Sequence, residues 1–419
     1  MFPAIRRSLP VVVAAALSTA VLLTIPSASA AAPAPAGYRF SGGGFGHGIG
    51  MSQYGAYGLA LRGATAGDIL RFYYGGATVG RASMPSNVRV GMLQQASSVV
   101  LAPTAAPGYA SGSIVLSGRN TRGGLTTRSF PAGSDYRARP LHGGVGVYRG
   151  SQLLFGPTAT GHALVVRYER GTRPAVVGLP QVGRSLRWGS LEIGAVSGRL
   201  RAVATLTWDR YLAGLGEVPS LWPRQALRAQ AIAARSYALA TVHSAGQYRG
   251  RDSASGCSCA VLSDTRDQNY VGWAKERGTG GSRWVEAVTS TSGIVVSWHG
   301  RVVKTFYSSS SGGWTASNSV WGSSPLPYYP ARTDPYDAAG GNNPNHAWTV
   351  DRSAAQVSKA LGRYGVGSVT GLKVTSADDS GRARRVLVSG TRRSVTISGD
   401  ALRRALGLKS TRVKVTARS

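Results

Sequence analysis

Negative charge is scarce in this sequence. Its 419 residues include 17 Asp plus Glu against 48 Lys plus Arg, a formal net charge of +31. The basic residues are scattered along the chain rather than gathered in blocks, so the whole molecule carries a positive field. We expect a general attraction to polyanions, with anionic wall polymers as partners and no nucleic acid if the chain is exported.

Long apolar runs are also scarce. The one near the start follows MFPAIRR, extends from Val11 to Ile25 and ends in SASA. This charged, apolar and small-residue order is typical of a secretory signal, which we place at residues 1–30. No later run is long and apolar enough to span a membrane. We therefore expect a secreted or cell-wall-associated protein.

Cysteine occurs only twice, at Cys257 and Cys259. In an oxidising compartment, such a pair forms either a small disulfide or two free thiols. A zinc site needs more ligands, and the nearest histidine in sequence is His243. We expect no metal and no cofactor.

Glutamate is the scarcity that matters most for chemistry, because only five are present. Glu169 and Glu192 lie in β-type alternation, and Glu276 and Glu286 lie in charged runs that we expect to be solvated. These four fit surface positions. Glu217 differs, because it lies in GLGEVPSLWP, between glycine and proline, among apolar neighbours.

Partial burial of the Glu217 carboxyl would raise its pKa and keep a general acid protonated near neutral pH. The alternative is a glutamate that caps the following helix. Asp209 is eight residues away, about 26 Å along a strand or about 12 Å along a helix. Both exceed the roughly 5–9.5 Å between paired glycosidase carboxyls. A single-acid mechanism is favoured, unless Asp264 or Asp334 folds in beside Glu217.

The pattern along the chain predicts a mixed α+β fold that is rich in strands. After a Pro/Ala linker at 31–37, glycine alternates with other residues over 40–51, which predicts a strand with one bare face. A helix should begin near Ser52, and Thr65 with Asp68 resembles a capping box. Short alternating runs over 85–205 indicate antiparallel strands. Residues 207–244 carry the strongest helical pattern. Within this stretch, we expect a central helix after the Glu217 motif.

Several other residues are candidates for binding a sugar chain. SSSSGGW at 308–314 follows a strand and offers hydroxyls and backbone donors, although a plain Ser/Gly surface loop is the alternative. His47 has glycine on both sides, so its ring must contact something across the fold. The candidate substrate-binding residues are Arg235, His47, Ser310, Ser311, Gly312, Gly313 and Tyr73.

Three strings together resemble the SpoIID/LytB family: GHGIGMSQYGA, YLAGLGEVPSLWPRQALRAQAIAARSYAL, and FYSSSSGGWT with SVWG. The resemblance implies a lytic transglycosylase that cuts peptide-stripped peptidoglycan strands and leaves 1,6-anhydro ends. It implies that Glu217 is the single acid and base. The alternative is a non-catalytic wall-binding protein that enhances an amidase.

The sequence departs from the family pattern in two ways. Some members bind zinc in a segment similar to 252–270, but Ser263 and Asp267 stand here where cysteines are expected. The glycine-histidine motif also comes first rather than last, which suggests a circular permutation. We expect a segment at 38–82 to complete a SpoIID-like domain at 186–419, with a β-rich accessory region at 83–185. The strand before Met51 should then lie beside the strand at Arg412 to Val415.

Overall fold

The structure is a computed structural model that describes residues 35–169, 173–251, 253, 256–339 and 342–419. The expected signal at 1–30 and most of the linker at 31–37 lie outside these residues. Within the described part of the chain, no helix combines the length and the hydropathy needed to cross a membrane.

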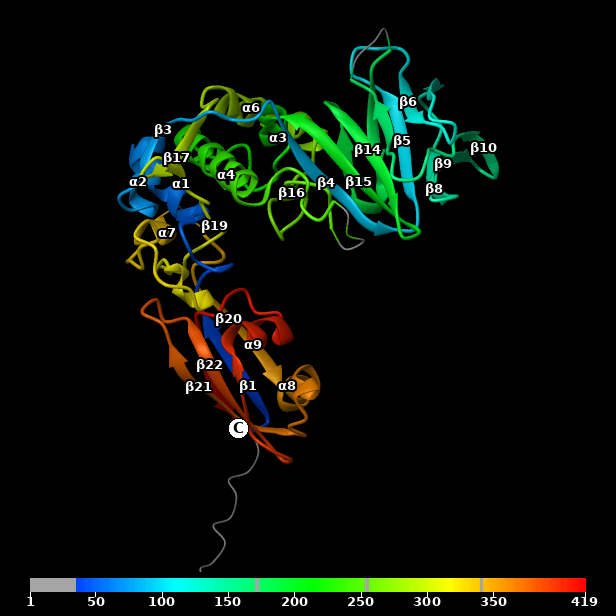
Figure 1. The fold of residues 1–419 in the computed structure, drawn as a ribbon. Helices are drawn as coiled ribbons and strands as arrows, with labels where there is room; N and C mark the ends of the chain where they lie inside the picture. The colour runs from blue at the N-terminus through cyan, green and yellow to red at the C-terminus, as the bar shows by residue number, and fades with distance from the viewer. Residues whose placement is uncertain (1–34, 170–172, 252, 254–255, 340–341) are drawn as a thin grey trace, which may run out of the picture. The chain divides into compact units, whose positions relative to one another are not determined.

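The predicted mixed α+β class is confirmed, and strands predominate (Figure 1). The helices are α1 (Gln53–Leu61), α2 (Ala66–Tyr73), α3 (Trp208–Ala213), α4 (Arg224–Ala245), α5 (Trp273–Arg277), α6 (Gly281–Thr289), α7 (Tyr336–Ala339), α8 (Ala354–Leu361) and α9 (Gly399–Leu406). The short 3₁₀ segments are η1 (Pro180–Val182), η2 (Asn318–Trp321) and η3 (Gly362–Tyr364).

The region predicted to be rich in β-structure forms two antiparallel sheets with a common apolar core. One sheet contains β5 (Val99–Ala105), β8 (Tyr136–Leu141), β9 (Gly144–Arg149), β10 (Gln152–Phe155), β12 (Ala175–Leu179) and β13 (Arg184–Leu186). The other contains β4 (Asn87–Ala96), β6 (Ser113–Arg119), β7 (Leu125–Pro131), β11 (Leu164–Arg167), β14 (Ser190–Val196) and β15 (Arg199–Thr207). A parallel edge strand, β16 (Val261–Leu262), pairs with β4.

The second sheet crosses the boundary that we expected between 185 and 186. β14 and β15 follow that boundary in sequence, yet they pair with β11 and β4. Alternation marks each strand separately and carries no information about which strands share a sheet. The accessory region is therefore joined to the rest of the chain by continuous hydrogen bonding.

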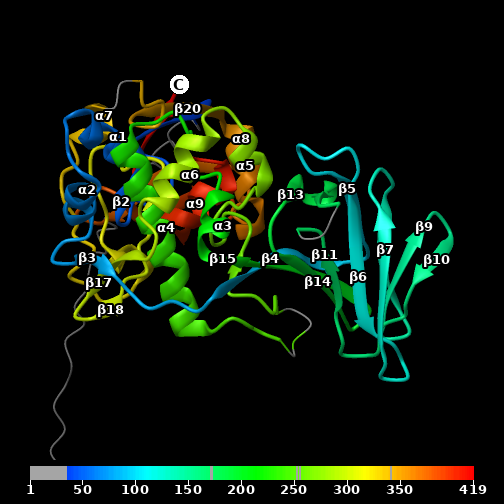
Figure 2. The ribbon, with the colours of Figure 1, turned by 90° about the horizontal axis from the view of Figure 1, so that it is seen from above.

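Helix α4 forms the centre of the next part of the fold. Leu227, Ala231, Ala234 and Ala238, which recur at helical spacing, are all fully buried. Helices α1 and α2 pack against α4 (Figure 2). The expected capping box at Thr65 is present. A small sheet covers α4 with β3 (Thr78–Arg81), β17 (Ile294–Trp298) and β18 (Arg301–Val302).

The predicted strand over 40–51 is wrong for most of its length. Strand β1 (Gly37–Gly42) ends early, and β2 (Met51–Ser52) resumes only at the start of α1. Between them, Gly44, Gly46, Gly48 and Gly50 have φ values of 84°, 106°, 78° and 67°. The period of two arises from alternate left-handed residues, a conformation that glycine adopts without a Cβ penalty, and not from a pleated strand.

The C-terminal part combines both ends of the described chain. β1 lies between β20 (Trp348–Ser353) and β24 (Val413–Arg418), with Phe40 opposite Val415 (Figure 1). The predicted pairing of the first strand with the 412–415 strand is thus confirmed, while the permutation itself stays a hypothesis. A further sheet contains β21 (Val369–Ala377), β22 (Ala383–Gly390) and β23 (Val395–Ser398).

Candidate functional site

Glu217 lies in the loop between α3 and α4, and its side chain is half-buried. The backbone N–H of Asn269 donates to Glu217 Oε1 at 2.6 Å. The hydroxyl of Tyr307, from β19 (Tyr307–Ser308), also hydrogen-bonds to this carboxyl. Lys275 Nζ donates to the carbonyl of Val218, the residue after Glu217. This hydrogen bond fixes the loop at the position of the acid.

Opposing effects set the protonation of Glu217. Burial raises its pKa, while the Asn269 N–H, the Tyr307 hydroxyl and the charge of Lys275 act in the other direction, and the net shift is upward. Burial lowers the pKa of Lys275 to about 8, against the attraction of Glu217. A carboxyl with a raised pKa that still accepts hydrogen bonds as an anion suits a group that gives a proton and takes one back.

Among the described residues, no carboxylate is a main cause of the shift in the pKa of Glu217. Asp264 pairs with Arg266 on the surface, and Asp334 is buried against Tyr73 and Ser311. Asp209 accepts from Ser292 and lies 3.5 Å from Arg235. Each of these aspartates has another partner, which leaves the single-acid arrangement.

Arg235 is not available to a substrate, which corrects its prediction as a substrate-binding residue. Its side chain is fully buried and donates to the carbonyls of Val288 and Ile294. Helical spacing placed Arg235 on α4. The residues that bury it belong to α6 and β17, some 50 residues later in the sequence, so local spacing could not predict the burial. Arg235 therefore ties α4 to that segment.

His47 lies close to Glu217 through a shared neighbour, Tyr307. The Tyr307 backbone hydrogen-bonds to the imidazole, and the Tyr307 hydroxyl reaches Glu217. The ring also meets the edges of Phe306 and Trp321, at centroid distances of 5.8 and 5.3 Å. Burial lowers the pKa of His47 to about 4, and the charge of Arg382 acts in the same direction. His47 is thus neutral at physiological pH, beside a half-exposed tryptophan.

The Ser/Gly run does not offer its hydroxyls to solvent, which corrects the expectation for Ser310 and Ser311. Both serines are fully buried. Ser310 Oγ donates to Asp337 and Ser311 Oγ to Asp334, each at 2.8 Å. Gly312 N–H also donates to Asp337, and of the four candidate residues in this run Gly313 alone keeps partial exposure.

Tyr73 belongs to the same buried cluster and is likewise no surface residue. Its hydroxyl bonds to Asp334 at 3.1 Å, and 1% of the residue is exposed. Burial raises the pKa of Asp334 to about 6. The cluster holds the loop after β19 against α2 and α7, which explains these residue types without a ligand.

Glu276 is the glutamate that sequence reasoning placed wrongly. Its side chain is 7% exposed, lies 3.9 Å from Arg210 and accepts from Trp188 Nε1. The flanking basic residues predicted a solvent-exposed side chain, but α5 directs the Glu276 side chain toward Trp188. Glu192 pairs with Arg89 and Glu286 with Arg224, while Glu169 accepts from Gly189 N–H.

Three residues that support Glu217 were missed: Asn269, Lys275 and Tyr307. Asn269 and Lys275 follow Glu217 by more than 50 positions, so no local spacing connects them to it. Tyr307 stands in the FYSSSSGGWT string, where the serines drew attention instead. The local signal for Tyr307 was its position directly before the serine run.

The two cysteines form a disulfide, which settles the open alternative between a bridge and free thiols. In the described ranges, no three His, Cys, Asp or Glu residues are grouped to hold a metal. Ser263 is buried, and Asp267 accepts from Arg249 and Tyr237. The absence of zinc stays a prediction.

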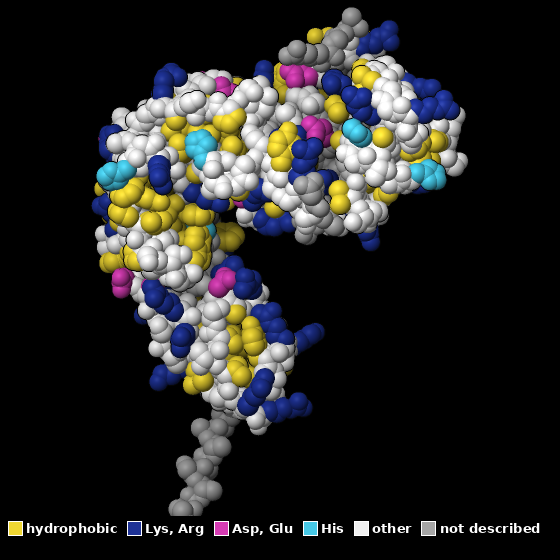
Figure 3. Space-filling model, in the orientation of Figure 1, with side chains coloured by type: hydrophobic (Ala, Val, Ile, Leu, Met, Phe, Trp, Pro, Cys, Tyr) yellow, Lys and Arg dark blue, Asp and Glu magenta, His cyan; other side chains and the backbone are white. Residues whose placement is uncertain are grey.

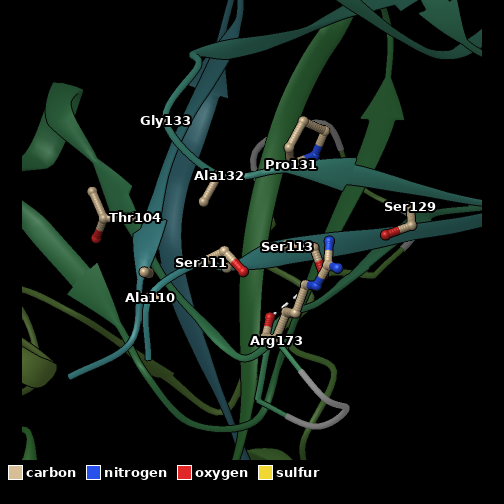
Figure 4. A pocket seen from close by; sticks show the side chains of 11 residues that line it. Thr104, Ala110, Ser111, Ser113, Ser129, Pro131, Ala132, Gly133 and Arg173 are labelled. Carbon is tan, nitrogen blue, oxygen red and sulfur yellow. Dashed lines mark hydrogen bonds between the residues drawn. The ribbon is translucent and has the colours of Figure 1, made fainter. Parts of the chain in front are cut away.

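The pocket shown in Figure 4 lies in the β-rich region, away from these residues. It has a volume of about 660 Å³ and is lined by Ser111, Ser113, Ser129 and Arg173 among others. The Ser113 hydroxyl faces the Arg173 carbonyl there. None of the candidate site residues lines it.

Comparison with known proteins supports a family domain around Glu217. The family described as "Stage II sporulation protein", SpoIID, matches residues 196–298. The chain therefore carries a SpoIID family domain, and the match includes the loop of Glu217 and residues Asn269 and Lys275.

The chain is distantly homologous to two named kinds of protein. It is 33% identical over 142 residues to the amidase enhancer of Bacillus subtilis (strain 168), covering 34% of this chain and 16% of that protein. It is 23% identical over 243 residues to stage II sporulation protein D of the same organism, covering 57% and 68%. The relative of that name in Bacillus amyloliquefaciens is 22% identical over 213 residues, covering 50% and 60%. The chain thus spans only a small part of the amidase enhancer.

Proposed function

We propose that this protein is an exported lytic transglycosylase that cleaves peptidoglycan glycan strands between MurNAc and GlcNAc, on peptide-stripped stretches. The observation that carries the proposal is Glu217: a half-buried carboxyl with a raised pKa and no carboxylate partner among the described residues. The SpoIID family domain around it and the homology to stage II sporulation protein D and to an amidase enhancer support a role at the cell wall. Secretion or wall association follows from the apolar leader.

The proposed reaction uses one group twice. Protonated Glu217 gives its proton to the glycosidic oxygen as the bond from that oxygen to C1 of MurNAc breaks, and the sugar develops oxocarbenium character. The Glu217 carboxylate then takes the proton of the C6 hydroxyl, whose oxygen bonds to C1. The products are a 1,6-anhydro end and a free hydroxyl, no water is consumed, and Glu217 is protonated again.

The neighbours of Glu217 have distinct roles in this scheme. Asn269 N–H and the Tyr307 hydroxyl fix the carboxyl, and Lys275 stabilises its anionic state between the two proton transfers. Trp321, with half of its surface exposed, and His47 beside it offer an aromatic face for a sugar ring. Arg235 takes no part, since its side chain is fully buried and is held by the carbonyls of Val288 and Ile294.

The test is the mass of the products. Purified protein is incubated with amidase-treated sacculi, and anhydro products are lighter than hydrolytic ones by one water. Wild-type protein should release them and Glu217→Gln should not. Hydrolytic products alone, or full activity of the variant, would show the assignment to be wrong.

A second function, a wall-binding protein that enhances an amidase, is favoured by the match to the amidase enhancer. It predicts salt-sensitive sacculus binding that survives Glu217→Gln. Stimulation of an added wall amidase, with no product from this protein alone, would select it over the transglycosylase.

A further inference from the structure

An open groove lies where β3 and the segment after it face the end of α4 and the β17–β18 hairpin. It has a volume of about 1100 Å³. Its polar side chains include Arg81, His243, Arg301, Ser83, Ser244 and Ser297. Gly80 and Gly300 border open space, since a Cβ on either would meet no atom within 4 Å. The groove is therefore not filled by the protein's own side chains.

The groove has positive charge and no negative charge of its own. No Asp or Glu is among its lining residues. Arg301 is exposed, and its guanidinium has no hydrogen-bond or ion-pair partner within the described chain. Arg81 is also exposed and donates from one nitrogen to the Ser292 carbonyl. Two guanidinium groups thus keep most of their donors available.

Nearby groups do not cancel this charge. Ser292, whose carbonyl accepts from Arg81, also donates from its hydroxyl to Asp209. The Asp209 carboxylate lies 3.5 Å from the buried Arg235, which is its charge partner. The C-terminal end of α4 carries partial negative charge, but Gly246 N–H caps the Val242 carbonyl and His243 lies in the last turn. Basic side chains also outnumber acidic ones on the face shown in Figure 3.

The mixture of donors indicates the class of ligand. Guanidinium groups bind phosphate oxygens through paired hydrogen bonds, and serine hydroxyls pair with phosphates or with the hydroxyls of a polyol. A site for single-stranded nucleic acid adds aromatic platforms on which the bases stack. The lining of this groove contains no Trp, Tyr or Phe. A chain of phosphates and small polyols fits this chemistry better than a chain of bases.

We propose that this groove binds a polyol chain linked by phosphodiesters, with Arg81 and Arg301 each on a phosphate of the chain and the serines on the polyol hydroxyls. The site is separate from the Glu217 carboxyl, and binding does not depend on cleavage. The inference therefore stands or falls independently of the proposed function.

The experiment measures binding of a glycerol-phosphate hexamer to the full chain by calorimetry at several salt concentrations. Arg81→Gln with Arg301→Gln should weaken binding about tenfold or more at low salt. It should also lower the salt slope by about 1.4, at roughly 0.7 for each phosphate contact on a flexible single strand. Arg301→Gln alone should give part of this loss, and it removes no contact within the described protein.

Arg385→Gln is the matched control, because Arg385 is an exposed arginine on β22, outside the groove. It should bind the hexamer as wild type does. An equal loss in this control would mean that only the overall charge attracts the polymer, and unchanged binding in the double variant would exclude the groove. Equally tight, groove-dependent binding of a DNA oligomer of the same charge would overturn the assigned ligand class.

Discussion

Two carboxyl sites of this protein, the buried aspartate pair and Glu217, differ in how many hydrogen bonds their carboxyl oxygens accept. Asp334 and Asp337 are fully buried, and Asp337 accepts from side chains and backbone N–H groups on several sides. Glu217 is half-buried and accepts from one backbone N–H and one hydroxyl. Saturated carboxylates hold loops together, whereas a half-buried carboxyl with few donors can still exchange its proton. This contrast separates the scaffold from the candidate acid better than residue type does.

The strongest test of the contrast removes the acid. Glu217→Gln keeps the size of the side chain and should reduce cleavage of stripped glycan by about 10²–10⁴-fold, the usual contribution of a general acid. Product release is followed by mass spectrometry and unfolding by thermal melting, which should change little. Glu286→Gln, at a surface ion pair, is the matched control and should retain full activity.

Removing the saturated carboxylate should instead affect stability. Asp337→Ala leaves Ser52, Ser310 and His346 without their partner and should lower the free energy of unfolding by about 3–5 kcal/mol. Urea denaturation measures this change. Asp379→Ala, on the exposed side of a turn, should change stability by less than about 0.5 kcal/mol. Equal effects of the two variants would contradict the scaffold role.

Asp334 sharpens the contrast through pH. Because burial raises its pKa to about 6 from the ordinary 3.8, the neutral form is favoured in the folded state. Its contribution is fully present below about pH 4 and is lost as pH rises through 6, and the difference corresponds to about 3 kcal/mol. Asp334→Asn should lack this loss of stability between pH 4 and 7. Parallel curves for variant and wild type in urea denaturation would refute the assignment.

The smallest effect is expected at Tyr307. Tyr307→Phe removes a hydrogen bond that lowers the pKa of Glu217, so that pKa should rise. We expect roughly a tenfold loss of cleavage, about 1.4 kcal/mol, together with a shift of the alkaline limb of the pH–rate profile to higher pH. Tyr336→Phe serves as control, since the ring of Tyr336 packs on Phe72 instead. A lower rate with an unmoved profile would make Tyr307 only structural.

Local patterns predicted local structure well. The capping box at Thr65, the helix after Ser52 and the buried face of α4 depend on near neighbours in sequence. The partial burial of Glu217 was also predicted locally, from its glycine, proline and apolar neighbours. Predictions failed where a distant segment decides: Arg235 is buried by α6 and β17, and Ser310 by Asp337. The strand predicted from the alternating glycines was wrong for another reason. A period of two describes the spacing of side chains and does not determine the sign of φ.

The position of β1 has a consequence for how the chain acquires its fold. β1 is the middle strand of its sheet, and both neighbouring strands come from residues 348–418. During synthesis from the N-terminus, β1 must stay unpaired until more than 300 further residues have emerged. Such a contact of high sequence separation closes late and slowly. Because β1 leads into the loop of His47, we expect the surroundings of Glu217 to form among the last steps of folding, and a chain that stalls during synthesis lacks them.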